Sequence, residues 1–114
     1  MNRDLVLHHL TEAHEALTRM IQEMRDTPDY DSGELFAEMP HLYHHLNTAW
    51  NARNAAQDEV QHVSDATFKR WSAFPDDLPE TINETIEALR ARAVSEPRAR
   101  RALAALYTLT RELQ

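Results

Sequence analysis

The sequence predicts an all-α fold, an antiparallel helical bundle of about four helices in a single domain over residues 1–114. Three observations support this prediction. The chain has 114 residues with one Gly and no Cys, a length typical of one domain. Ala, Leu, Glu and Arg, which favour helices, are abundant. Apolar residues recur at steps of three and four along most of the chain, and no segment alternates as a strand does.

The first helix is expected over about residues 3–26. Its apolar positions step by threes and fours, and we expect them to face the core: Leu7, Leu10, His14, Leu17, Ile21 and Met24. The segment 27–33 contains a Pro and the single Gly, which predicts a turn. Asp31 stands three residues before Glu34, a spacing that predicts a capping box at the start of the next helix.

A long second helix is expected over about residues 32–72, because apolar steps of three and four continue from Leu35 to Trp71. Pro40 lies inside it. An internal Pro removes one backbone hydrogen bond and clashes with the preceding turn, so we expect a kink or a restart near residue 40. The sequence from Ser64 to Thr67 offers a second restart. Folded back on the first helix, this helix would overhang it, and later helices, a bend or a second subunit must cover the overhang.

Two further helices are expected over about residues 79–93 and 96–113. The segment 72–79 contains two Pro and a pair of Asp residues, which predicts a loop before the third helix. Ser95 and Pro97 suit the cap and the first turn of the fourth helix. Four amphipathic helices with short connections favour a bundle.

Composition narrows the classes of function. The net charge is −7, and a chain this acidic is a poor partner for nucleic acid, whose binding rests on neutralised phosphates. The absence of Cys excludes disulfides, thiolate metal sites and Cys nucleophiles. No signal peptide and no apolar stretch of ~20 residues is visible, so we expect a cytoplasmic protein with no membrane partner.

The run from His41 to Asn54 is the most informative stretch, since it holds three His, three Asn, a Trp and an Arg on a helix that is otherwise amphipathic. Polar side chains of this kind cost stability in a helix whose only role is to pack against other helices. We expect a small binding or interaction module rather than an enzyme. We expect it to form a homodimer, and it can have another protein as a partner. The predicted contact surface comprises Tyr43, Asn47, Trp50, Asn51, Arg53 and Asn54.

Structural roles compete with this interpretation. Arg53 falls on the apolar stripe of the second helix, where a buried guanidinium demands a partner. An ion pair with Asp4 that fixes helix register is favoured over an anionic ligand beside Trp50. The three Asn residues suit either hydrogen bonds to another chain or ligand, or a solvated face.

The first reading requires no cofactor, but the histidines support an alternative. His41 and His45 are four residues apart on a helix, so both rings can reach one ion. His14 or Glu12 of the first helix is a candidate third ligand, and Zn or Fe suits such a donor set. A metal-binding protein or metal-dependent enzyme is therefore the second hypothesis. The third is a pH-responsive regulator, because the seven His titrate between pH ~5 and ~8.

Overall fold

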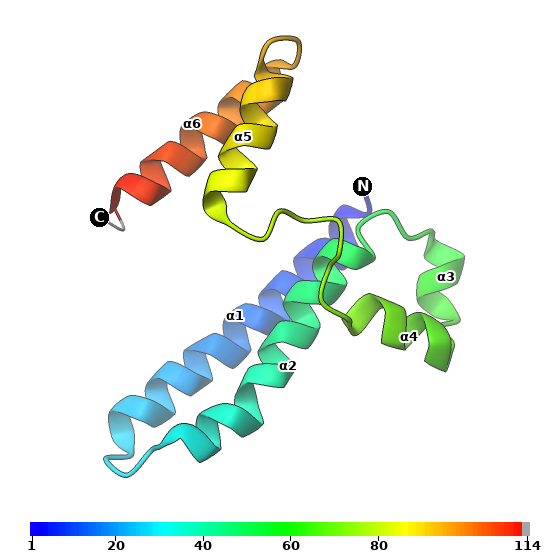
Figure 1. The fold of residues 1–114 in the computed structure, drawn as a ribbon. Coiled ribbons are helices and arrows are strands. Elements are labelled where there is room, and N and C mark those ends of the chain that lie inside the picture. Colours follow the sequence, from blue (N-terminus) through cyan, green and yellow to red (C-terminus); the bar gives the residue numbers. More distant parts are fainter. Residues whose placement is uncertain (113–114) are drawn as a thin grey trace. The chain divides into compact units, whose positions relative to one another are not determined.

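A computed structural model describes residues 1–112, and every regular element in them is an α-helix (Figure 1). The all-α prediction is confirmed. There are six helices in this described part rather than four: α1 (Arg3–Asp26), α2 (Ser32–Asn51), α3 (Gln57–Gln61), α4 (Asp65–Ser72), α5 (Ile82–Ala93) and α6 (Pro97–Glu112). The predicted last helical residue, Leu113, lies outside the described residues. None of these helices combines the length and the apolar character needed to cross a bilayer.

The chain divides into two compact units, the first from Met1 to Pro75 and the second beginning at Asp76. That both belong to the single domain expected from the sequence stays a prediction. The connection between the units gives a physical reason for the division. Residues 76–81 are all exposed and bury no side chain of their own. The two units are described separately below.

In the first unit, α1 and α2 form an antiparallel hairpin (Figure 1). Asn2 caps α1 by accepting a hydrogen bond from the backbone N–H of Leu5. The predicted capping box of α2 is confirmed: Asp31 accepts from the N–H of Gly33, and Glu34 accepts from the N–H of Asp31, both at 2.8 Å. α2 continues through Pro40 to Asn51.

The face of α1 that is buried differs from the one expected. Its buried residues are Leu5, Ala13, Ala16 and Met20. The expected core positions are 44–55 % exposed and form what we call the outer stripe: Leu7, Leu10, Leu17, Ile21 and Met24. His14 is exposed as well. Ala13 and Ala16 on α1, together with Ala49 on α2, supply small residues to the buried seam between Leu5 and Met20. Small side chains let two helix backbones approach closely, while Leu and Ile hold them apart.

The expected helix over residues 32–72 is three helices, α2, α3 and α4. Contacts from other parts of the chain stabilise the break after Asn51. The backbone N–H of Asn2 donates to the carbonyl oxygen of Arg53 at 2.6 Å, and the Asn2 side chain donates to that of Ala55 at 3.1 Å. These carbonyls serve the start of α1 instead of a continued helix. The restart predicted at Ser64 is confirmed, since its hydroxyl accepts from the N–H of Thr67.

The helix break turns α4 back against α2. It brings Trp71 into a small core with Leu5 and Ala52, all less than 9 % exposed, and Ala55 and Val60 pack against it. The overhang predicted for a long second helix is thus removed by folding.

The second unit is a hairpin of α5 and α6. Thr81 caps α5 by accepting from the N–H of Glu84, and Ile86 of α5 and Ala99 of α6 are buried. Arg90 donates to the hydroxyl of Tyr107 across the pair. This unit carries none of the predicted site residues.

Candidate functional site

A cluster of five histidines lies along the seam between α1 and α2, with His45 buried at its centre and His8 and His41 exposed. His9 comes from α1 and lies against His45 of α2, with their Nδ1 atoms 3.1 Å apart. On its other side His45 meets His41, and their Nε2 atoms are also 3.1 Å apart. His8 and His44 flank this row, with ring centroids about 5 Å from His9 and His45 respectively. In each close pair one ring nitrogen donates and the other accepts, so neutral rings can form a continuous hydrogen-bonded row.

The environment of the cluster favours neutral imidazole. Burial, and then the neighbouring His8, His45 and His44, lower the pKa of His9 to about 4, while Glu12 opposes the shift. Burial and neighbouring imidazoles also lower the pKa of His44 and of His45. Desolvation and like charge both disfavour imidazolium. At neutral pH, His9, His44 and His45 therefore offer one donor and one acceptor each, and no positive charge.

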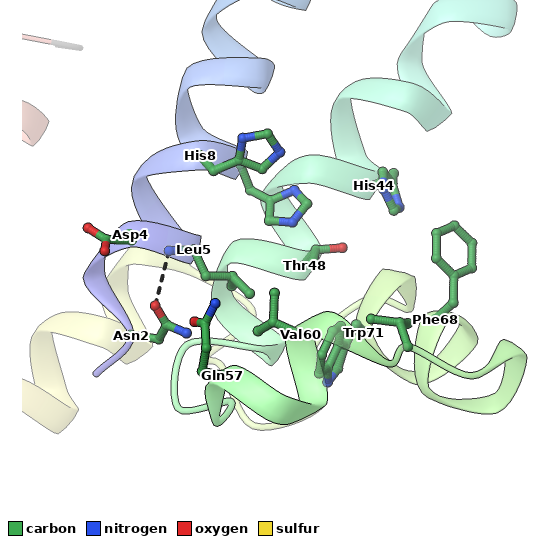
Figure 2. Close-up of a pocket in the computed structure, with 12 residues that line it drawn as sticks. Asn2, Asp4, Leu5, His8, His44, Thr48, Gln57, Val60, Phe68 and Trp71 are labelled. Carbon is green, nitrogen blue, oxygen red and sulfur yellow. Dashed lines mark hydrogen bonds between the residues drawn. The ribbon is translucent and has the colours of Figure 1, made fainter.

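A cavity of about 460 Å³ opens beside the cluster, between the start of α1, the middle of α2 and the segment α3–α4. Figure 2 shows His8 and Leu5 of α1, His44 and Thr48 of α2, and residues of α3 and α4 arranged around it. Its apolar walls are Leu5, Val60, Val63, Phe68 and Trp71. No Lys or Arg lines it, and the single acidic lining residue is Asp4. A mainly apolar concavity with a few convergent polar groups is typical of a small-molecule site.

Thr48 is the polar residue of this wall that the fold leaves unsatisfied. It is 3 % exposed, and its hydroxyl has no hydrogen-bond partner among the described residues. In Figure 2 its oxygen points towards the side of the cavity where His44 and Phe68 stand. A buried hydroxyl without a partner costs about 1–3 kcal/mol, so Thr48 lowers stability where it stands.

Two of the predicted contact residues make hydrogen bonds within the chain. The side-chain amide of Asn47 donates to the carbonyl oxygen of Ser72 at 3.0 Å. That of Asn51 donates to the carbonyl oxygens of Trp71 and Ala73 at 2.8 and 2.7 Å. Both residues hold the end of α4 against α2. The remaining carbonyls at a helix end need such donors.

The other predicted contact residues lie elsewhere on α2 and just after it. The guanidinium of Arg53 stacks over the Trp50 ring at 3.8 Å and donates to the Trp50 carbonyl oxygen, an arrangement the sequence interpretation, with its ion pair to Asp4, did not anticipate. Tyr43 packs edge-on against Phe74. Asn54 is exposed. The structure brings Trp50 and Arg53 together but does not gather all six residues, and their role in binding remains a prediction.

The proposed metal ligands are distributed over two places. His41 and His45 are adjacent, as their spacing predicted. His14 lines a shallow depression with Arg19 and Glu23, and Glu12 is half-buried on α1. Within the described part of the chain, no group of three or more His, Asp or Glu residues is placed to hold a metal ion. Zn or Fe binding by His41, His45, His14 and Glu12 stays a prediction.

Sequence reasoning missed His8, His9 and Thr48. The adjacent pair of His residues on the first helix was a usable signal, because the second helix carries its own group of His residues and the two helices were expected to pair. Thr48 gave no signal, since its importance lies in a hydroxyl that only coordinates show to be unpartnered.

The chain matches no protein-family model, no curated protein and no solved structure.

Proposed function

We propose that this protein is an interaction module that forms a homodimer through one flank of the α1–α2 hairpin. The observation that carries the proposal is the outer stripe. Its five large apolar side chains are 44–55 % exposed, although they lie along one line, broken at His14, on a 24-residue helix. An exposed apolar surface of this size on a helix marks an interaction site.

The spacing of the outer stripe fits another helix. Positions 7, 10, 14, 17, 21 and 24 alternate steps of three and four over nearly three heptads, which is the a/d pattern of helices that pack knobs into holes. A different face of α1 packs in the hairpin seam, so the side chains of this pattern are not buried within the hairpin.

Charge supports a second copy as the occupant. The stripe positions themselves, with the neighbouring Thr11 and Thr18, carry no Asp, Glu, Lys or Arg, and the charged residues that directly follow a stripe position are Glu15 and Arg25. A chain with a net charge of −7 repels its own copies over most of its surface. An uncharged strip is where two copies can approach without that penalty.

α2 contributes to the same flank. Helical periodicity places Leu46 on the side of the hairpin that faces away from His8 and His44, and Arg53 follows just after the end of α2 at Asn51. Leu46 is 40 % exposed. Trp50 lies next to them and stacks on Arg53, and aromatic and Arg side chains are enriched at interfaces. Trp50 and Arg53, proposed from the sequence as contact residues, are thus retained in this surface.

The available area is sufficient. A hairpin of 24-residue length is roughly 36 Å long and about 20 Å wide, and two such flanks would bury about 1,400 Å² in total. Stable interfaces bury about 1,200–2,000 Å². Two hairpins placed flank to flank would give four antiparallel helices from two chains, a different bundle from the single-chain one expected from the sequence.

The test is the molar mass in solution, measured by light scattering on wild type and on Leu17→Glu. Wild type should have twice the 13.2 kDa of one chain. Leu17→Glu should have the mass of one chain with unchanged helical circular dichroism, because two buried carboxylates would face an apolar surface. Leu109→Glu changes a Leu of the second unit that is 57 % exposed, against 44 % for Leu17, and should remain dimeric.

A gain-of-function variant sharpens the test. His14 interrupts the stripe at an a position, so His14→Leu should strengthen the dimer and move its dissociation to lower concentration. A wild type with the mass of one chain at all concentrations, or a dimer that Leu17→Glu leaves intact, would refute the proposal.

A further inference from the structure

The cavity beside the histidine cluster lies on the opposite side of the hairpin from the outer stripe, and its features are independent of the dimer. We propose that this cavity binds a small uncharged organic molecule that has an apolar body and one hydroxyl or carbonyl oxygen. The apolar body would occupy the space between Leu5, Val60 and Trp71, and the oxygen would meet Thr48.

Thr48 is the strongest reason for a ligand. Its hydroxyl is buried and unpartnered while the residue lines a cavity. A Val of the same shape would remove the cost of the unpaired hydroxyl. A ligand oxygen would instead form a hydrogen bond with the Thr48 hydroxyl. Ligand binding would then offset the free-energy cost of that unpartnered hydroxyl.

The lining chemistry selects an uncharged head group. Besides Thr48, the polar lining residues include His8, His9, His44 and Gln57. Because burial lowers the pKa of His9 and of His44, these two rings are neutral donors and acceptors at pH 7. With no Lys or Arg in the lining, a carboxylate has no fixed counter-ion. The one carboxylate of the lining, Asp4, is exposed to solvent and stands at the start of α1, apart from Thr48 in Figure 2. An ammonium beside Thr48 would therefore be buried without a close counter-ion, which is costly.

The size and walls of the cavity select an apolar body. About 460 Å³ accommodates a ring with a short side chain. Phe68 is 52 % exposed at the rim, and its ring lies 5.1 Å from that of His44, so an aromatic ligand has flat surfaces to stack on.

A second cavity on the hairpin, of about 520 Å³, is the natural internal comparison. It is lined by Leu35, Phe36, Met39, Tyr43 and Phe74 among others. The Asn47 amide on its wall already donates to the carbonyl oxygen of Ser72. No unpartnered buried side chain lines it within the described residues, so it lacks the feature that points to a ligand.

The experiment titrates the full chain at pH 7 with three probes that share one body: 2-phenylethanol, phenylacetate and 2-phenylethylamine. Isothermal titration calorimetry gives the affinity, and amide chemical shifts give the location. We expect 2-phenylethanol to bind at least about tenfold more tightly than either charged probe, with the largest shifts at Thr48 and Val60. No shifts at those amides, or equal binding of a charged probe, would overturn the proposal.

Matched variants assign the contacts. Thr48→Val should weaken 2-phenylethanol about tenfold, the size of one lost hydrogen bond, while the melting temperature stays or rises. Thr85→Val, a hydroxyl outside the cavity that bonds to the Thr81 carbonyl oxygen, should leave the affinity unchanged. An unchanged affinity in folded Thr48→Val would reject the assignment.

A second pair keeps the test decisive if Thr48→Val fails to fold. Phe68→Ala shortens an exposed wall of the proposed site, and Phe36→Ala, at 81 % exposure, does the same in the second cavity. Affinity should fall in Phe68→Ala alone. A fall in Phe36→Ala alone would place the binding in the other cavity and overturn the proposal.

Discussion

The two long faces of α1 invert the usual relation between side-chain size and burial. The inner face, against α2, is built from Ala13, Ala16 and Met20 with His9, whereas the outer stripe holds the large aliphatic residues and is about half exposed. Hydrophobic content alone would have buried the outer stripe. The comparison shows that small side chains decide how closely two helices of a hairpin approach. The larger apolar side chains of the outer stripe are then left for contacts outside the hairpin.

The largest expected effect comes from enlarging the inner face. Ala16 is 3 % exposed, so Ala16→Leu forces extra methyl and methylene groups into a packed seam and should lower the free energy of unfolding by about 1–3 kcal/mol. Chemical denaturation followed by circular dichroism measures it. Ala37→Leu, at an exposed position of α2, is the matched control and should change stability by less than about 0.5 kcal/mol. Equal effects would show that the seam has room for a Leu.

The sequence predicted the features of this arrangement that depend on neighbouring residues and missed those that depend on distant ones. Helix caps were predictable, because Asp31 with Glu34 and Ser64 with Thr67 act within three residues. The buried face of α1 was not, since the periodic aliphatic pattern is stronger than the pattern of small residues beside it. The end of α2 depends on Asn2, fifty residues away along the chain, which binds the carbonyls of Arg53 and Ala55, so no local signal marks it.

The candidate site was predictable in part for the same reason. The spacing of His41 and His45 on one helix implied that their rings meet, and they do. The arrival of His9 from α1 depends on which face of α1 is buried, and the stronger periodic pattern pointed to His14 instead. The cavity, finally, exists because α4 folds back on α2, which a continuous helix over residues 32–72 would have prevented.

An intermediate effect is expected from acid, which acts on the inner face and not on the outer stripe. The pKa of His9 is about 4 in the folded chain and 6.5 ordinarily. Between these values the unfolded chain binds more protons, so stability falls as the pH falls from about 6.5 to 4. Since His9 is partly exposed to solvent, the loss is about 1–2 kcal/mol after allowing for screening.

Denaturation curves across this pH range measure the loss. His9→Gln should flatten the dependence, because the group that resists protonation is gone. His62→Gln changes an exposed His outside the cluster and should keep the wild-type slope. A slope that His9→Gln leaves unaltered would contradict the prediction and assign the acid response to other groups, such as His44 and His45, whose pKa is also lowered.

The smallest and most local effect is expected at the hydrogen bonds that hold α4 on α2. Asn51→Ala removes the donor to the carbonyl oxygens of Trp71 and Ala73 and should cost about 1 kcal/mol, with amide exchange accelerated in α4 more than in α1. Asn51→Asp should cost more than Ala, because a carboxylate facing two carbonyl oxygens repels them and supplies no donor. Asn54→Ala, at an exposed neighbour, is the control. If Asp and Ala have the same effect, the Asn51 amide does not hold the end of α4, and the cavity beside it must be shaped by the packing of Trp71 alone.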